Sequence, residues 1–177
     1  MHTVNPKWMM MYLDYAIRAA QESHAVRLKV GAIFVSPNGV MCMGINGMPE
    51  GGTNECEFRE YMDPSAGGWL SPDEIALQWP YIERVGEFEQ EERRYCLVTK
   101  PECLHAEENL FAKLMKQGVS TIGGKLFMTH SPCPNCAKLI ERAGITHVFY
   151  IDDYRLSSGP EYLRSHGVKV AKLKSGK

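Results

Sequence analysis

The sequence contains no apolar run long enough to cross a membrane as a helix, and its first residues lack the pattern of a signal peptide. We therefore expect no membrane partner. The 20 Lys and Arg residues are balanced by 21 Asp and Glu residues, so the positive charge typical of proteins that bind a long polyanion is also missing. This balance predicts that the protein has no nucleic-acid partner.

Internal repeats and a disulfide framework are absent as well. The six cysteines do not show the paired pattern of small secreted domains, which indicates a reduced protein of the cytoplasm. A chain of 177 residues is long enough to bury a sizeable core. We expect one cytoplasmic domain over residues 1–177.

The first quarter of the chain predicts one helix followed by two strands. Apolar residues recur at helical spacing from Pro6 to about Ser23. Residues 30–35 and 40–45 read as short strands, and the Asn-Gly pair at 38–39 is a strong signal for a hairpin turn between them.

Helices and strands alternate in the last third of the chain. Helical patterns cover residues 105–118, 133–143 and 161–166. Strands are predicted over residues 125–128, 146–151 and 168–173. This alternation indicates an α/β layer structure around a mixed sheet.

The region between Asn54 and about Glu102 has the weakest pattern. Ser71–Glu74 reads as the start of a helix. Glu83–Arg94 is heavily charged and is predicted to form the solvated face of a helix. We interpret residues at about 57–100 as an insertion on the core fold.

Two short motifs carry the chemistry. His105-Ala106-Glu107 is followed downstream by a proline and a Cys-x-x-Cys pair, Cys133 and Cys136, which together match the zinc-deaminase signature H-x-E and P-C-x-x-C. One imidazole and two thiolates suit Zn²⁺ and leave its fourth position open to water, whose pKa falls to about 7. Glu107 can shuttle protons without ligating the metal.

Each motif also has an ordinary explanation. His-Ala-Glu can begin any helix, and Cys-x-x-Cys also occurs in redox and structural zinc sites. A structural zinc normally has a fourth Cys or His close by. The presence of both motifs in order favours a catalytic zinc over a non-enzymatic, zinc-stabilised binding module, because such a module has no use for Glu107.

The order of elements and motifs resembles the cytidine deaminase-like superfamily and, more narrowly, its larger deoxycytidylate (dCMP) deaminases from phages and eukaryotes. Besides the metal motifs, the resemblance rests on Val30-Gly31-Ala32 and on the loop G-x-N-G-x-P-x-G at 44–51, and it covers most of the chain outside residues 57–100. It implies a three-layer α/β/α fold with a mixed five-stranded sheet flanked by helices. The implied reaction is hydrolysis of dCMP to dUMP and ammonia. A modified cytosine nucleotide or a base in a nucleic acid are alternative substrates.

The same resemblance assigns roles to individual residues. The zinc ligands would be His105, Cys133 and Cys136, with Glu107 as proton shuttle. Ala106 would offer its backbone N–H to the pyrimidine carbonyl, and Ser131 would accept from the exocyclic amine through its own carbonyl. Asn46 would contact the deoxyribose, although Asn in a Gly-rich turn is commonly a plain turn residue. Tyr154 would lie near the pocket, with ordinary packing as the equal alternative.

The substrate phosphate requires cations. Arg27 is the preferred candidate, ahead of Lys29 and Lys116, and any of the three taken alone would be an ordinary solvated charge.

Regulation is also implied by the resemblance. Relatives form homohexamers with an effector site for dCTP and dTTP, usually with Mg²⁺. Here the site would use the loop residues Gly44, Asn46, Gly47 and Gly51, because glycines let the backbone approach a ligand closely. Ile45 stands where relatives usually have Tyr.

Some relatives hold a second, structural zinc. The nearest candidate ligands are His24, Cys56, Cys96 and Cys103, although Ala25 and Glu55 occupy the better-aligned positions. The alternative is that these cysteines are ordinary buried thiols.

Overall fold

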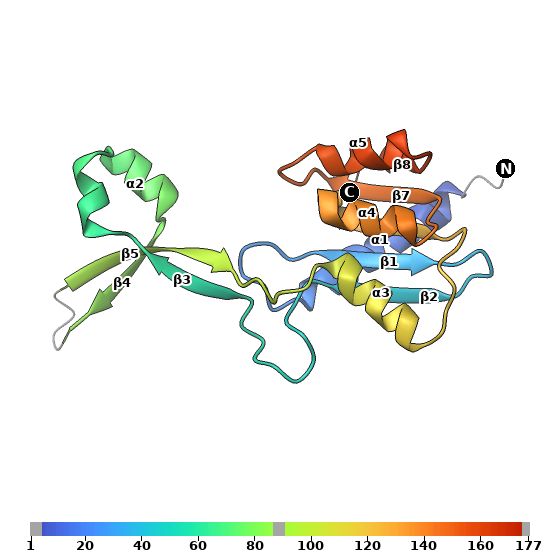
Figure 1. Ribbon diagram of the computed structural model, residues 1–177, viewed down its shortest axis with the longest axis horizontal. Coiled ribbons are helices and arrows are strands. Elements are labelled where there is room, and N and C mark those ends of the chain that lie inside the picture. The colour runs from blue at the N-terminus through green and yellow to red at the C-terminus, as the bar shows by residue number, and fades with distance from the viewer. Residues whose placement is uncertain (1–4, 87–90, 175–177) are drawn as a thin grey trace.

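The computed structural model describes residues 5–86 and 91–174, which form two separate sheets (Figure 1). The main sheet has the order β2-β1-β6-β7-β8. Its strands are β1 (Gly31–Val35), β2 (Met41–Ile45), β6 (Lys125–His130), β7 (His147–Asp152) and β8 (Lys169–Lys172). β1 is antiparallel to both of its neighbours, whereas β6, β7 and β8 run parallel. The mixed five-stranded sheet predicted from the sequence is confirmed.

Helices cover both faces of the main sheet. They are α1 (Pro6–Gln21), α3 (Ala106–Lys116), α4 (Pro134–Arg142) and α5 (Ser158–Ser165). Alternate residues of a strand point to opposite faces. Ile33 and Val35 therefore pack in the cluster that includes α1, whereas Ala32 and Phe34 pack in the cluster that includes α3, α4 and α5. The three-layer α/β/α arrangement is confirmed. None of the described helices is long and apolar enough to cross a membrane.

Both metal motifs lie at helix N-termini because their residues suit those positions. His105 is the N-cap of α3, where its backbone N–H donates to the Glu108 carboxylate at 2.7 Å. Cys133 is the N-cap of α4, and its Sγ accepts from the backbone N–H of Cys136 at 3.4 Å. Pro134 occupies the first turn of α4, where a backbone N–H has no partner within the helix, so the missing N–H of proline costs no helical hydrogen bond. The positive ends of both helices thus point to one place.

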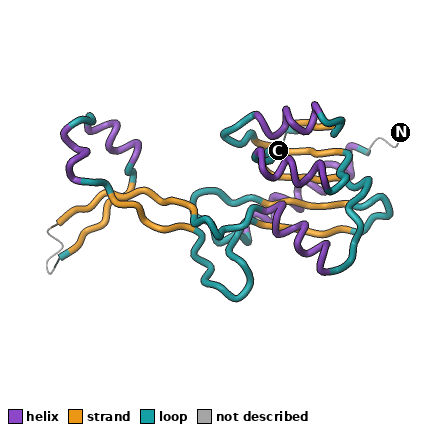
Figure 2. Tube along the Cα trace, viewed as in Figure 1, coloured by secondary structure: helices purple, strands orange, loops and turns teal. Residues whose placement is uncertain are grey.

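Residues 57–86 and 91–99 form a second structure, which we call the arm. It contains β3 (Glu57–Tyr61), the 3₁₀ turn η1 (Pro64–Gly68), α2 (Pro72–Gln78), β4 (Tyr81–Val85) and β5 (Glu91–Thr99). The three strands are antiparallel in the order β3-β5-β4. In Figures 1 and 2 the arm extends away from the main sheet, and loops alone connect the two.

The predicted helix over Glu83–Arg94 is wrong. Most of this stretch belongs to β4 and β5, and residues 87–90 lie outside the described part of the chain. The charges pair across the strands, as in the 3.1 Å ion pair between Arg84 and Glu92. The error has a physical cause, because a sheet exposed on both faces has no buried side to impose an apolar period of two. The predicted helix start at Ser71 is confirmed, with Ser71 and Glu74 forming a capping box.

Candidate active site

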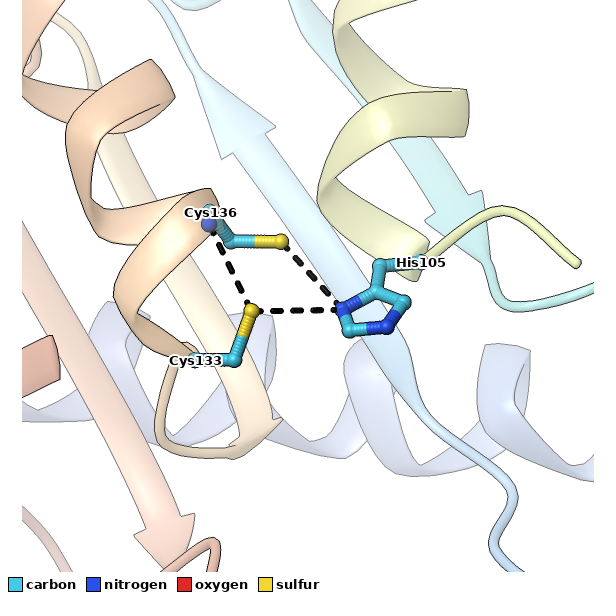
Figure 3. A group of neighbouring side chains, drawn as sticks. All are labelled: His105, Cys133 and Cys136. Carbon is cyan, nitrogen blue, oxygen red and sulfur yellow. Dashed lines mark hydrogen bonds between the residues drawn. The ribbon is translucent and has the colours of Figure 1, made fainter. Parts of the chain in front are cut away.

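Three metal-ligating side chains meet where α3 and α4 begin (Figure 3). His105 Nδ1 lies 3.5 Å from Cys133 Sγ and 3.3 Å from Cys136 Sγ. Zinc–nitrogen and zinc–sulfur bonds of ordinary length would hold these atoms about 3.6 Å apart at tetrahedral angles. Spacing and donor chemistry therefore both fit Zn²⁺. Within residues 5–86 and 91–174, no other three His, Cys, Asp or Glu side chains gather in this way.

The three ligands share protons when no metal is bound. Hydrogen bonds, first with Cys136 and then with His105, lower the pKa of the Cys133 thiol to about 4. The hydrogen bond with Cys133 raises the pKa of His105 to about 9. The pKa of Cys136 is raised, first by its hydrogen bond to Cys133 and then by burial. A bound cation would replace these shared protons, so metal binding must release protons.

Glu107 lies in the first turn of α3, beside the metal ligands. Its side chain is only 3% exposed. Burial raises the pKa of its carboxyl from 4.5 to about 7. A carboxyl with this pKa can both take up and release a proton near neutral pH.

A cavity of about 380 Å³ opens beside the ligands, a size common for small-molecule sites. Its lining includes Glu107 and all five residues that the sequence predicted to bind substrate, namely Arg27, Asn46, Ala106, Ser131 and Tyr154. The two alternative cations lie outside this lining. Lys29 donates to the carbonyl of Gln21, and Lys116 pairs with Glu50 at 3.4 Å.

The Asn46 side chain holds the loop that precedes β1 through hydrogen bonds. Its Oδ1 accepts from Val30 N at 2.8 Å, and the Ser23 hydroxyl lies 2.8 Å from both this oxygen and the Asn46 carbonyl oxygen. Its Nδ2 donates to the Leu28 carbonyl at 2.8 Å. One N–H of Nδ2 is thus left for a ligand in the cavity.

Hydrogen bonds at Ser131 connect the loop that follows β6 to the end of β7 and the loop after it. Tyr154 N donates to Ser131 Oγ at 2.8 Å, which fixes Tyr154 next to the Cys133 loop. Gly159 packs against the same loop so closely that a Cβ there would lie 2.0 Å from the Pro132 carbonyl oxygen.

Sequence reasoning missed three lining residues that bear on ligand binding. Arg155 lies over the Tyr154 ring at 5.4 Å and donates to its hydroxyl at 3.1 Å, which adds a second cation to the cavity beside Arg27. Arg155 directly follows Tyr154 in the sequence, and this position next to a predicted pocket residue could have indicated it. Glu57 and Thr99 come from the arm, and no local pattern marks either of them.

The glycines predicted to bind an effector differ in their surroundings. Gly44 packs against α3, where a Cβ would lie 2.1 Å from the Ala106 carbonyl oxygen. Gly47 exchanges two backbone hydrogen bonds with Leu104, and a Cβ there would meet open space. Gly51 has a positive φ of 89° and is also open. The backbone is therefore approachable at Gly47 and Gly51 but not at Gly44.

The four candidates for a second zinc do not gather. Cys56 and Cys103 lie in a small buried cluster with Ala25 and Met48. Burial, together with a hydrogen bond to Cys56, raises the pKa of Cys103 to about 12. Cys96 lies on β5, where its Sγ is 3.6 Å from a Glu60 carboxylate oxygen. His24 and Cys56 line a shallow hollow that neither Cys96 nor Cys103 borders.

Comparison with known proteins gives the family. Residues 6–152 match the model of the cytidine and deoxycytidylate deaminase zinc-binding region. The chain belongs to this family of zinc-dependent deaminases.

Within this family, the chain is similar to individual deoxycytidylate deaminases. The chain is 29% identical over 172 residues to the deoxycytidylate deaminase of Enterobacteria phage T4, covering 89% of this chain and 86% of that protein. It is 32% identical over 145 residues to the deoxycytidylate deaminase of Mycobacterium phage D29, covering 82% of this chain and 94% of that protein. Among solved structures, dCMP deaminase from the cyanophage S-TIM5 in complex with dCMP and dUMP superposes with a TM-score of 0.72 at 34% identity. This superposition covers 97% of this chain and 100% of that one.

Proposed function

We propose that this protein hydrolyses dCMP to dUMP and ammonia. The observation that carries the proposal is the placement of Glu107 and the His105, Cys133 and Cys136 cluster at one end of a cavity large enough for a nucleotide. The similarity to deoxycytidylate deaminases over most of the chain supports the choice of substrate.

The residues around the cluster suit cytosine deamination. A zinc ion bound by three protein ligands supplies an activated water at its open position. Glu107 would take the two protons of the attacking water in turn, delivering the first to the ring nitrogen and the second to the departing amine. The Ala106 N–H would donate to the pyrimidine carbonyl, and the Ser131 carbonyl would accept from the exocyclic amine.

Part of the lining suits a monophosphate. Arg27 and Arg155 are cations that border the same cavity, and Tyr154 lies between Ser131 and Arg155. Charge-assisted hydrogen bonds from two guanidinium groups would favour a nucleotide over a nucleoside. Asn46 would use its remaining N–H toward the deoxyribose.

The test is ammonia release from deoxycytidine, dCMP, 5-methyl-dCMP and single-stranded DNA by the zinc-loaded protein. We expect kcat/KM for dCMP to exceed that for deoxycytidine by about a hundredfold or more, the effect of two charge-assisted contacts. Faster turnover of 5-methyl-dCMP would instead favour a modified nucleotide as substrate. Activity on DNA alone would contradict the proposal.

We also propose that the protein is a homohexamer activated by dCTP and inhibited by dTTP, each bound with Mg²⁺ near the Gly44–Gly52 loop. The open backbone at Gly51 supports contact with a phosphate chain. Sigmoidal dCMP kinetics that become hyperbolic with dCTP, and light scattering at six times the chain mass, are the expected results. Hyperbolic kinetics unchanged by either nucleotide would contradict the regulation.

Within this proposal, residues 1–177 form one deaminase domain that carries an insertion at about 57–100. None of the six cysteines, all of which lie in the described part of the chain, forms a disulfide, and this supports a location in the reducing cytoplasm.

A further inference from the structure

The arm contributes directly to the cavity through its root. Glu57 is the first residue of β3 and Thr99 is the last residue of β5, and both line the cavity. They face each other in the register of the β3–β5 pair. Two side chains from strands far apart in the sequence therefore meet at one border of the proposed nucleotide site.

Both side chains bind the residue that we propose to hold the phosphate. One Glu57 carboxylate oxygen accepts from Val26 N and Arg27 N, each at 3.1 Å, and the other accepts from Val26 N at 3.2 Å. Thr99 Oγ1 accepts from Arg27 Nη1 at 3.3 Å. The root of the arm thus holds Arg27 by its backbone and by its guanidinium.

The loop that carries Arg27 is held by side chains rather than by regular structure. It joins α1 to β1 and contains no helix or strand of its own. Asn46 bonds it at Leu28 and Val30, and Glu57 bonds it at Arg27 itself. An unrestrained Arg side chain loses rotamer entropy when it binds a ligand. Holding Arg27 before the ligand arrives lowers that loss.

The charge of Glu57 also needs an explanation, because a carboxylate repels a phosphate in the same cavity. Its oxygens are directed to backbone N–H groups of the Arg27 loop, where a carboxylate is a strong acceptor. We propose that Glu57 and Thr99 are positioning residues that hold Arg27 ready for the substrate phosphate. This inference rests on the proposed dCMP hydrolysis and gives the arm a part in substrate recognition.

Steady-state kinetics of zinc-loaded variants test the inference. Glu57→Ala removes all the acceptor atoms, and we expect KM for dCMP to rise about tenfold while kcat stays within about threefold. Thr99→Val removes one acceptor at nearly constant shape and should raise KM about threefold. Glu57→Gln keeps an amide oxygen that can accept both N–H groups, so its KM should return to within about threefold of the parent value.

Glu55→Gln is the matched control. Glu55 lies two residues from Glu57 in the sequence, and its exposed carboxylate pairs with Lys100 at 3.6 Å outside the cavity. Its KM for dCMP should equal that of the parent. A lower KM in Glu57→Ala would show that the carboxylate only repels the phosphate and would overturn the inference.

A double-mutant cycle shows whether Glu57 acts through Arg27. In an Arg27→Ala background, Glu57→Ala should add less than about twofold to KM, because the group that it positions is gone. Independent, multiplicative effects would overturn the inference. If the parent does not release ammonia from dCMP, the proposed function fails. If the parent is active and Arg27→Ala raises KM but Glu57→Ala and Thr99→Val do not, only the positioning role fails.

Discussion

Asn109 and Ile45 connect the helix that carries Glu107 to the end of an edge strand. Asn109 Nδ2 donates to the Ile45 carbonyl at 2.8 Å, and this bond joins α3 to β2 beside the Gly44 loop. Close backbone packing at Gly44 accompanies it. The position of α3 therefore depends on a strand residue 64 positions away in the sequence.

A side chain at Gly44 should disturb this contact. A Cβ there would lie 2.1 Å from the Ala106 carbonyl oxygen, and backbone cannot move aside cheaply. We expect Gly44→Ala to lower the free energy of unfolding by about 3 kcal/mol. Urea unfolding measures the change. Gly47→Ala is the control, because it enters open space and should stay within about 0.5 kcal/mol of the parent.

Zinc content should follow the cysteine pair. Metal analysis of the purified protein should find about one zinc per chain, held by His105, Cys133 and Cys136. Cys133→Ala and Cys136→Ala should each lose most of it, because two remaining ligands bind zinc weakly. Cys96→Ala, on the arm and away from the cluster, should keep the parent content. Full retention in both site variants would refute the assigned ligands.

Removal of the Glu107 carboxyl should separate metal binding from turnover. Glu107→Ala leaves all three ligands, so zinc content should remain at the parent level. Turnover of dCMP should fall by about a thousandfold or more, because no other buried carboxyl in the described chain borders the ligands to transfer protons. Residual turnover within about tenfold of the parent would contradict the shuttle role.

The same carboxyl should make the stability of the metal-free protein depend on pH. Its pKa rises from 4.5 to about 7 on folding, so the folded state binds the proton more tightly than the unfolded state. Stability is then lost as pH rises from about 4.5 to about 7, by roughly 3 kcal/mol from this group. In Glu107→Gln this contribution is absent. Urea unfolding of chelator-treated protein at pH 5 and pH 8 should show a smaller decline in the variant. Equal declines in both proteins would contradict the raised pKa.

Much of the core fold and the metal site could be predicted from local sequence. Ser71, His105 and Cys133 each lie at the start of a helix, where capping chemistry acts between residues three apart. The inner strands of the main sheet, β1, β6 and β7, are buried on both faces and so read as short apolar runs. These signals are local, and a single sequence is enough to find them.

Local sequence identifies the side chains that can ligate zinc and move protons, because a short motif at each of two helix starts contains all of them. The residues that surround them are brought there by tertiary packing. The strands of the arm went unpredicted because both of their faces meet solvent and no apolar alternation marks them. Arg27 and Thr99 are 72 residues apart and meet only because β3 and β5 return the chain to the cavity. Contacts of this kind depend on strand pairing and register, which no local pattern of residue types specifies.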